Sequence, residues 1–276
     1  MNAEMLSYIR KDSPIHRLSG ATKLICFLLW TVAAMVTYDT RVLLGMLIFG
    51  LLVFKISKIE YKEVSFLLYF ILFFLCLNAV MIFVFAPYEG VNIYGTRTDL
   101  IHLVGPYTVT KEQLFYELNV MLKYFATIPM ALLFILTTEP SEFAASLNRL
   151  GISYKAAYTV SIALRYIPDI QRDYRDISFA QQARGIDLSK KEKLMKRIKN
   201  STSILMPLIF SSLDRIDKIS LAMELRAFGH GKKRTWYNSR KFDNMDYLAI
   251  LIFIVLLIIS LYMINVNGGR FYNPFM

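Results

Sequence analysis

Two long apolar runs without a charged residue constrain this chain more than any other part of its sequence. Val64–Phe85 has 22 residues and Tyr247–Ile264 has 18, and neither contains Asp, Glu, Lys or Arg. A helix of roughly 20 such residues spans the ~30 Å hydrocarbon core of a bilayer. The chain is therefore predicted to be an integral membrane protein, in keeping with its 55% hydrophobic residues.

Three further apolar segments predict additional membrane helices. They are Ala21–Tyr38, Val42–Phe54 and Leu114–Leu136. The second has only 13 residues, so it crosses only if it extends over 42–59 while its lysines reach back to the interface. We expect an all-α integral membrane protein with about five transmembrane helices. The glycines and β-branched residues of 87–110 predict a small loop or hairpin there.

The distribution of Lys and Arg predicts the orientation of these helices. The segments 1–23, 55–63 and 138–244 lie on one side of a five-helix arrangement and hold 27 of the 32 basic residues. Basic residues collect on the cytoplasmic side, so the N-terminus and 138–244 are expected there, and 87–110 outside. The net charge of +11 is then a consequence of topology, and nucleic-acid binding is not expected.

This pattern divides the chain into three regions. We expect an N-terminal transmembrane region over 1–137, a cytosolic helical region over 138–244, and a last transmembrane helix with its tail over 245–276. Within the second region, apolar residues at steps of three and four predict amphipathic helices over 154–182 and 205–227. Pro168 is expected to kink the first of these helices, and Pro207 to lie near the start of the second.

Both amphipathic helices end at an arginine beside small residues, in Ala183-Arg184-Gly185 and Leu225-Arg226-Ala227. Glycine commonly follows a helix end and arginine complements its dipole, so a purely structural role explains either motif. Two exposed tips, with arginines 42 residues apart, would also suit a two-pronged docking surface, because guanidinium pairs bidentately with carboxylates. The residues alone leave both explanations open.

Four ordered stretches of the sequence resemble the transmembrane T component of energy-coupling factor transporters, the EcfT/CbiQ family. They are Ser13–Leu18 with Ala21–Leu24; Glu139–Glu142 with Leu147–Ile152; Ala163–Pro168 running to Ala180–Gly185; and Pro207-Leu208, Ser212-Leu213 and Ala222–Gly229. The chain departs from the family in its second arginine motif, which is usually also Ala-Arg-Gly. Here Leu225 and Ala227 flank the arginine, so both flanking residues are larger while the charge is kept.

The resemblance implies a non-catalytic coupling subunit in a prokaryotic cell membrane. Its partners would be two cytosolic ABC ATPases and a small membrane-embedded S subunit that binds a vitamin, a vitamin precursor or a metal ion. The cytosolic helices would form a crossed pair, and each motif arginine would meet an acidic groove on one ATPase. The implied coupling residues are Ala183, Arg184, Gly185, Leu225, Arg226 and Ala227.

ATP and Mg²⁺ are expected in the partner ATPases, because this chain has no Walker A pattern. No cofactor or metal is expected here, since His16, His102 and His230 lack ligand spacing. The basic run 190–199 is expected to be solvated, or attracted to anionic membrane lipid.

Two other classes of protein fit this sequence less well than a coupling subunit. A membrane-embedded lipid-modifying enzyme would need clustered His, Asp or Glu at one end of a span, whereas the carboxylates here are spread along helices. A self-sufficient secondary transporter would favour more spans and internal repeats. Lys123, inside the fourth predicted span, is either a functional intramembrane charge or a side chain that reaches the interface.

Overall fold

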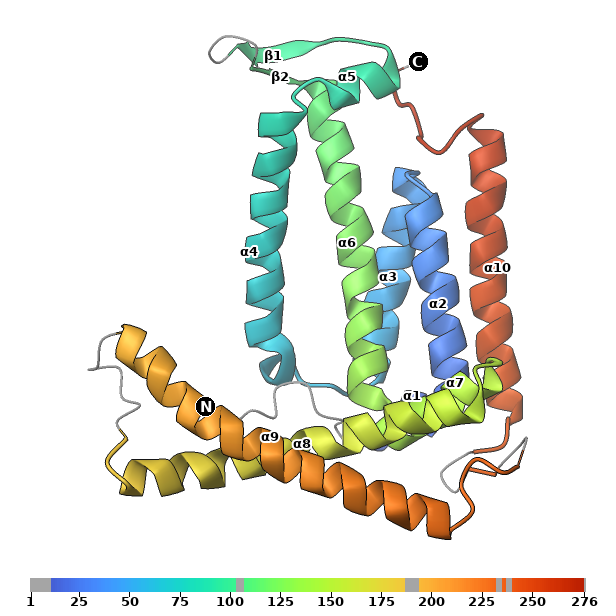
Figure 1. Cartoon of the computed structure of the whole chain (residues 1–276). Coiled ribbons are helices and arrows are strands. Elements are labelled where there is room, and N and C mark those ends of the chain that lie inside the picture. The colour runs from blue at the N-terminus through green and yellow to red at the C-terminus, as the bar shows by residue number, and fades with distance from the viewer. Residues whose placement is uncertain (1–10, 103–106, 187–193, 232–234, 237–239, 276) are drawn as a thin grey trace. The chain divides into compact units, whose positions relative to one another are not determined.

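The computed structural model describes residues 11–102, 107–186, 194–231, 235–236 and 240–275. These residues form ten helices and one small hairpin (Figure 1), so the predicted all-α class is confirmed. The chain divides into two compact units. The first comprises Met1–Glu139 and Arg240–Met276, and the second comprises Pro140–Ser239.

Helices occur in the first unit at all five predicted positions. They are α2 (Gly20–Val36), α3 (Thr40–Ile56), α4 (Tyr61–Phe85), α6 (Lys111–Thr137) and α10 (Asn244–Val266). Three of these, α4, α6 and α10, are long and apolar enough to cross a membrane. The helices α2 and α3 have 17 residues each, or about 26 Å, which is the lower limit for spanning. That they cross stays a prediction.

One tryptophan joins four helices at the core of this unit. The side chain of Trp30 on α2 is 1% exposed, and its ring packs against Phe49 of α3 and Phe253 of α10. Its Nε1–H donates to the carbonyl oxygen of Ala126 on α6 at 3.1 Å. Because a buried indole N–H without an acceptor is costly, this bond fixes α2 against α6.

Lys123 caps a helix end and does not reach the surface. Its side chain is 6% exposed, and its Nζ donates to the carbonyl oxygen of Met35 at 3.0 Å. The same ammonium lies 3.3 Å from the centroid of the Tyr38 ring. The last carbonyls of a helix lack intrahelical donors and carry partial negative charge, so Lys123 stabilises the C-terminal end of α2. A structural role thus accounts for this charge.

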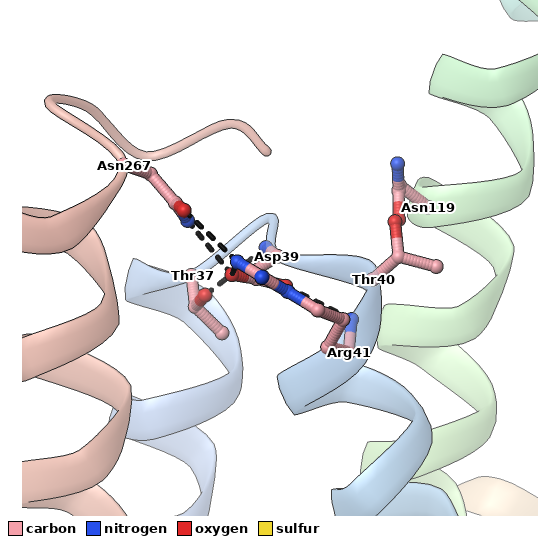
Figure 2. A network of polar contacts seen from close by, with 6 residues as sticks. All are labelled: Thr37, Asp39, Thr40, Arg41, Asn119 and Asn267. Atoms are coloured by element: carbon pink, nitrogen blue, oxygen red, sulfur yellow. Dashed lines mark hydrogen bonds and ion pairs between the residues drawn. The ribbon is translucent and has the colours of Figure 1, made fainter. Parts of the chain in front are cut away.

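A polar network fixes the turn between α2 and α3 (Figure 2). The Asp39 side chain is 1% exposed and accepts the backbone N–H of Arg41 at 2.9 Å, which caps α3. Asp39 Oδ2 also accepts from Arg41 Nη2 at 2.8 Å and from Asn267 Nδ2 at 2.7 Å. Thr40 Oγ1 donates to Asn119 Oδ1 at 2.7 Å. The turn is thereby bound to α6 and to the residue that follows α10.

The segment between α4 and α6 contains the predicted hairpin and one helix that was not predicted. Strands β1 (Asp99–His102) and β2 (Thr108–Thr110) pair antiparallel, after the short helix α5 (Glu89–Tyr94). The buried carboxylate of Glu112 accepts the Thr98 N–H at 3.0 Å and holds the hairpin on α6. Gly90 meets the first turn of α6 so closely that a Cβ there would lie 2.4 Å from the Glu112 carbonyl oxygen.

The tail that follows α10 packs on the same end of the unit. The Phe271 ring stacks on Tyr38, with centroids 4.5 Å apart, and also contacts Tyr94. The Phe275 ring lies 5.7 Å from that of Tyr94. The Tyr38 N–H donates to the Arg270 carbonyl oxygen at 2.9 Å. The tail therefore joins the α2–α3 turn to α5.

Candidate functional site

The second unit consists of α7 (Pro140–Arg149), α8 (Tyr154–Ala183) and α9 (Leu194–Leu225). Helix α8 continues through Pro168. The prediction that α9 begins near Leu205 is wrong, because the helix starts at Leu194 and holds Pro207 in its interior. Within the basic run 190–199, residues 194–199 are helical, while 190–193 lie outside the described residues.

A neighbouring side chain explains how α9 accommodates Pro207. Proline lacks an N–H, so the carbonyl four residues earlier loses its helical donor. That carbonyl belongs to Ser203, and it accepts from Gln181 Nε2 of α8 at 3.1 Å. The Gln181 side chain is buried for this purpose. Sequence reasoning missed this bond because the two residues are 22 positions apart.

The helices α8 and α9 run in opposite directions and cross (Figure 1). Arg215 of α9 forms an ion pair with Asp173 of α8, and its guanidinium lies 5.7 Å from the centroid of the Tyr166 ring. Beyond the end of α9, Phe228 returns to the start of α8, where its ring lies 5.7 Å from that of Tyr154. The end of α9 is therefore next to the beginning of α8.

The first arginine motif closes α8 with a double hydrogen-bonded turn. Arg184 is the C-cap residue after Ala183, and Gly185 follows with φ = +85°. The Gly185 N–H donates to the Gln182 carbonyl at 2.9 Å, and the Ile186 N–H donates to the Gln181 carbonyl at 3.1 Å. This pair of bonds defines a Schellman motif, in which the left-handed position favours glycine.

The second arginine motif closes α9 with the same pair of bonds. The Ala227 N–H donates to the Glu224 carbonyl and the Phe228 N–H to the Met223 carbonyl, both at 2.9 Å. Ala227 has φ = +53° and takes the place that Gly185 has after α8. The turn is therefore closed by an alanine, two residues before Gly229. The sequence shows the same substitution, because Leu225-Arg226-Ala227 has alanine where Ala183-Arg184-Gly185 has glycine.

All six predicted coupling residues lie at these two helix ends. They are Ala183, Arg184, Gly185, Leu225, Arg226 and Ala227, and every one is exposed. The Arg184 guanidinium has no partner within the part of the chain that the structure describes. Because Phe228 packs at the start of the 30-residue helix α8 and Arg184 follows its end, about 45 Å separates the two arginine tips.

The second unit also leaves many large apolar side chains uncovered. The exposed fraction is 66% for Phe179, 59% for Phe210 and 81% for Leu225. Others on the two helices are Ile167, Ile170, Tyr174, Leu205, Met206, Ile209, Leu213, Ile216 and Leu221. Apolar surface of this extent on one pair of helices marks an interaction surface. Within the described residues, no group of three or more His, Cys, Asp or Glu side chains could hold a metal ion.

Comparison with known proteins gives one matching family and several similar chains. The model of the CbiQ family, described as cobalt transport protein, matches residues 11–237. The energy-coupling factor transporter transmembrane protein EcfT of Clostridium kluyveri is 29% identical over 262 residues, covering 92% of this chain and 94% of that protein. The EcfT of Lactococcus lactis is 28% identical, covering 94% and 96%.

A relative of another kind is a putative ABC transporter ATP-binding protein of Bifidobacterium longum. It is 29% identical over 260 residues, and the match covers 89% of this chain but only 32% of that protein. A region similar to this chain is thus part of a longer polypeptide named for ATP binding.

Proposed function

Because the chain belongs to the CbiQ family of cobalt transport proteins, we propose that it is the non-catalytic transmembrane coupling subunit of an energy-coupling factor importer. One observation carries this proposal: two exposed arginines lie at helix ends that are closed by the same pair of hydrogen bonds, near opposite ends of α8. A single helix end with arginine is explained by local stability alone. Two matched and widely separated ends suit attachment to two bodies.

The partners of these tips are two cytosolic ABC ATPase subunits. A guanidinium presents a planar fork of donors that pairs bidentately with a carboxylate, so each tip suits an acidic groove. A distance of about 45 Å, the length of α8, favours one groove on each of two subunits over a single shared groove. The ATP-binding relative, which includes a region like this chain, supports a partnership with ATPases. ATP and Mg²⁺ belong to those subunits.

The third partner is a small membrane-embedded S subunit that binds the substrate, which is a vitamin, a vitamin precursor or a metal ion. The uncovered apolar side chains of α8 and α9 supply a surface on which a hydrophobic subunit can pack. Crossed helices that contact both kinds of partner can transmit the closing of the ATPases to the S subunit. The Lys and Arg distribution supports a cytoplasmic N-terminus and cytoplasmic α8 and α9.

Charge reversal at the tips tests the proposal. We expect Arg184→Glu and Arg226→Glu each to weaken the attachment of one ATPase about 30-fold, corresponding to a lost and inverted ion pair of about 2 kcal/mol. The double variant should lose both ATPase subunits. The measurement is the ATPase-to-chain ratio after purification of the complex in detergent, together with substrate uptake.

The matched control is Arg175→Glu, which reverses an exposed arginine in the same helix away from its end. It should retain both ATPases. An unchanged ATPase ratio in the double variant would refute the proposed function, and a chain that carries out uptake alone would favour a secondary transporter.

A further inference from the structure

We infer that Phe228 is a positioning residue for Arg226: by packing against α8 it holds the second arginine tip in a backbone conformation that the first tip adopts through glycine. The inference rests on the proposed function of Arg226 as an ATPase contact. It adds that the two tips, although alike in hydrogen bonding, keep their shape by different means.

The residue after Arg226 has a backbone conformation that is unfavourable for an L residue. Ala227 has φ = +53°, a left-handed conformation in which the Cβ of an L residue crowds the following carbonyl. Glycine takes this conformation freely. A non-glycine residue persists there when the surrounding structure determines it. Some contact beyond the turn must therefore keep Ala227 in place.

That contact is an aromatic clasp, which we define as Tyr154, Tyr158, Phe228 and Trp236. The Phe228 ring lies 4.7 Å from that of Tyr158 and 5.7 Å from that of Tyr154. Trp236 contacts Tyr158 at 6.3 Å, and its Nε1–H donates to Asn148 Oδ1 of α7 at 3.0 Å. Phe228 is the residue whose N–H closes the turn on Met223, so the clasp and the turn share one residue.

The first tip lacks this device. Its left-handed residue is Gly185, around which a Cβ would meet no atom within 4 Å. Ile186 stands where Phe228 stands in the second motif, and within the described residues it has no polar or ring contact beyond the turn itself. The conformation of the Arg184 tip is thus set locally, whereas that of the Arg226 tip depends on α7 and α8.

Hydrogen exchange of the purified chain tests the conformational part without any ATPase. We expect Phe228→Ala to speed exchange of the amides of residues 227 and 228 on the order of tenfold, while those of 185 and 186 stay unchanged. Ala227→Gly added to Phe228→Ala should restore most of the protection, because glycine needs no anchor. Phe228→Tyr, which keeps the ring, should behave as the unaltered chain. The matched control Ile186→Ala should leave its own turn protected.

Attachment is then measured in the Arg184→Glu background, where only the second tip engages. There Phe228→Ala should lower ATPase retention about tenfold, and the Ala227→Gly, Phe228→Ala pair should recover it. Unchanged exchange in Phe228→Ala overturns the inference. The inference is also overturned if Phe228→Ala exchanges faster but retains the ATPase while Arg226→Glu loses it. In that case the proposed function stands. If Arg226→Glu has no effect either, the proposed function fails along with the inference.

Discussion

Replacing Asp39 with alanine should destabilise the first unit by about 3 kcal/mol. Its carboxylate caps α3 through the Arg41 N–H, and loss of such a cap costs about 1 kcal/mol. The hydrogen bond that the Asn267 side-chain amide donates to Asp39 adds about 1 kcal/mol. The ion pair with Arg41, whose side chain is 50% exposed, contributes at most about 1 kcal/mol after screening by solvent.

The cysteines of the chain supply the assay. Cys26 is buried and Cys76 is exposed, so in a Cys76→Ser background a thiol-reactive dye reports unfolding through Cys26 alone. A loss of about 3 kcal/mol lowers Tm by roughly 6 to 12 °C for a unit of this size.

The matched control for this experiment is Asp99→Ala. Asp99 also pairs with an arginine two residues away, Arg97, but both side chains are 51% exposed. Its removal should change Tm little. Asp39→Asn keeps a capping side chain and should cost less than Asp39→Ala. If Asp39→Ala and the unaltered chain have the same Tm, the conclusion that this network stabilises the first unit is refuted.

Lowering the pH should reproduce part of the loss of stability caused by Asp39→Ala. Burial raises the pKa of Asp39, but the bonds from Arg41 and Asn267 outweigh it and hold that pKa below its ordinary value. A carboxyl whose folded pKa is lowered stabilises the fold above its unfolded pKa of about 4. That contribution is lost as pH falls through the lower folded pKa. The Tm difference between Asp39→Asn and the unaltered chain should therefore narrow as the pH falls from the unfolded pKa to the lower folded pKa of Asp39.

Two further substitutions test other contacts of the first unit. Gly90→Ala should cost about 2 kcal/mol or more, because its Cβ would lie 2.4 Å from the Glu112 carbonyl oxygen in the backbone of α6. The comparison is Gly45→Ala, whose Cβ would meet no atom within 4 Å and whose φ is not left-handed; an equal Tm for the two variants would contradict this expectation. Lys123→Met should cost about 1 to 2 kcal/mol through loss of the α2 cap and the Tyr38 contact. Uptake by the assembled Lys123→Met transporter should persist, and its abolition at unchanged stability would restore a transport role for this lysine.

The sequence was sufficient to place the main helices because their signal is local. The run Val64–Phe85 became α4 (Tyr61–Phe85) and Tyr247–Ile264 became α10 (Asn244–Val266), each extended at its start by polar residues. Those added residues belong to capping boxes at Glu60 and Asp243. Apolar length predicts the lipid-compatible part of a helix but not the polar turn before it.

The features that escaped prediction depend on contacts between distant residues. Pro207 indicated a helix start, yet the Gln181 amide satisfies the carbonyl that this proline leaves free. Phe271 and Phe275 of the tail belong to no periodic pattern in the sequence. They pack on Tyr94 because of where α10 ends. At the arginine tips, composition indicated helix ends, but the left-handed Ala227 is intelligible only once Phe228 is seen against Tyr158.

The uncovered apolar side chains of α8 and α9 have a consequence for synthesis of the protein in the cell. A copy without the proposed partner subunits leaves Phe179, Phe210 and Leu225 uncovered, and such surfaces attract chaperones, proteases and other unassembled copies. The amount of this chain that survives should therefore follow the supply of its companions. Co-expression with them, more than a stronger promoter, should raise the yield of intact protein.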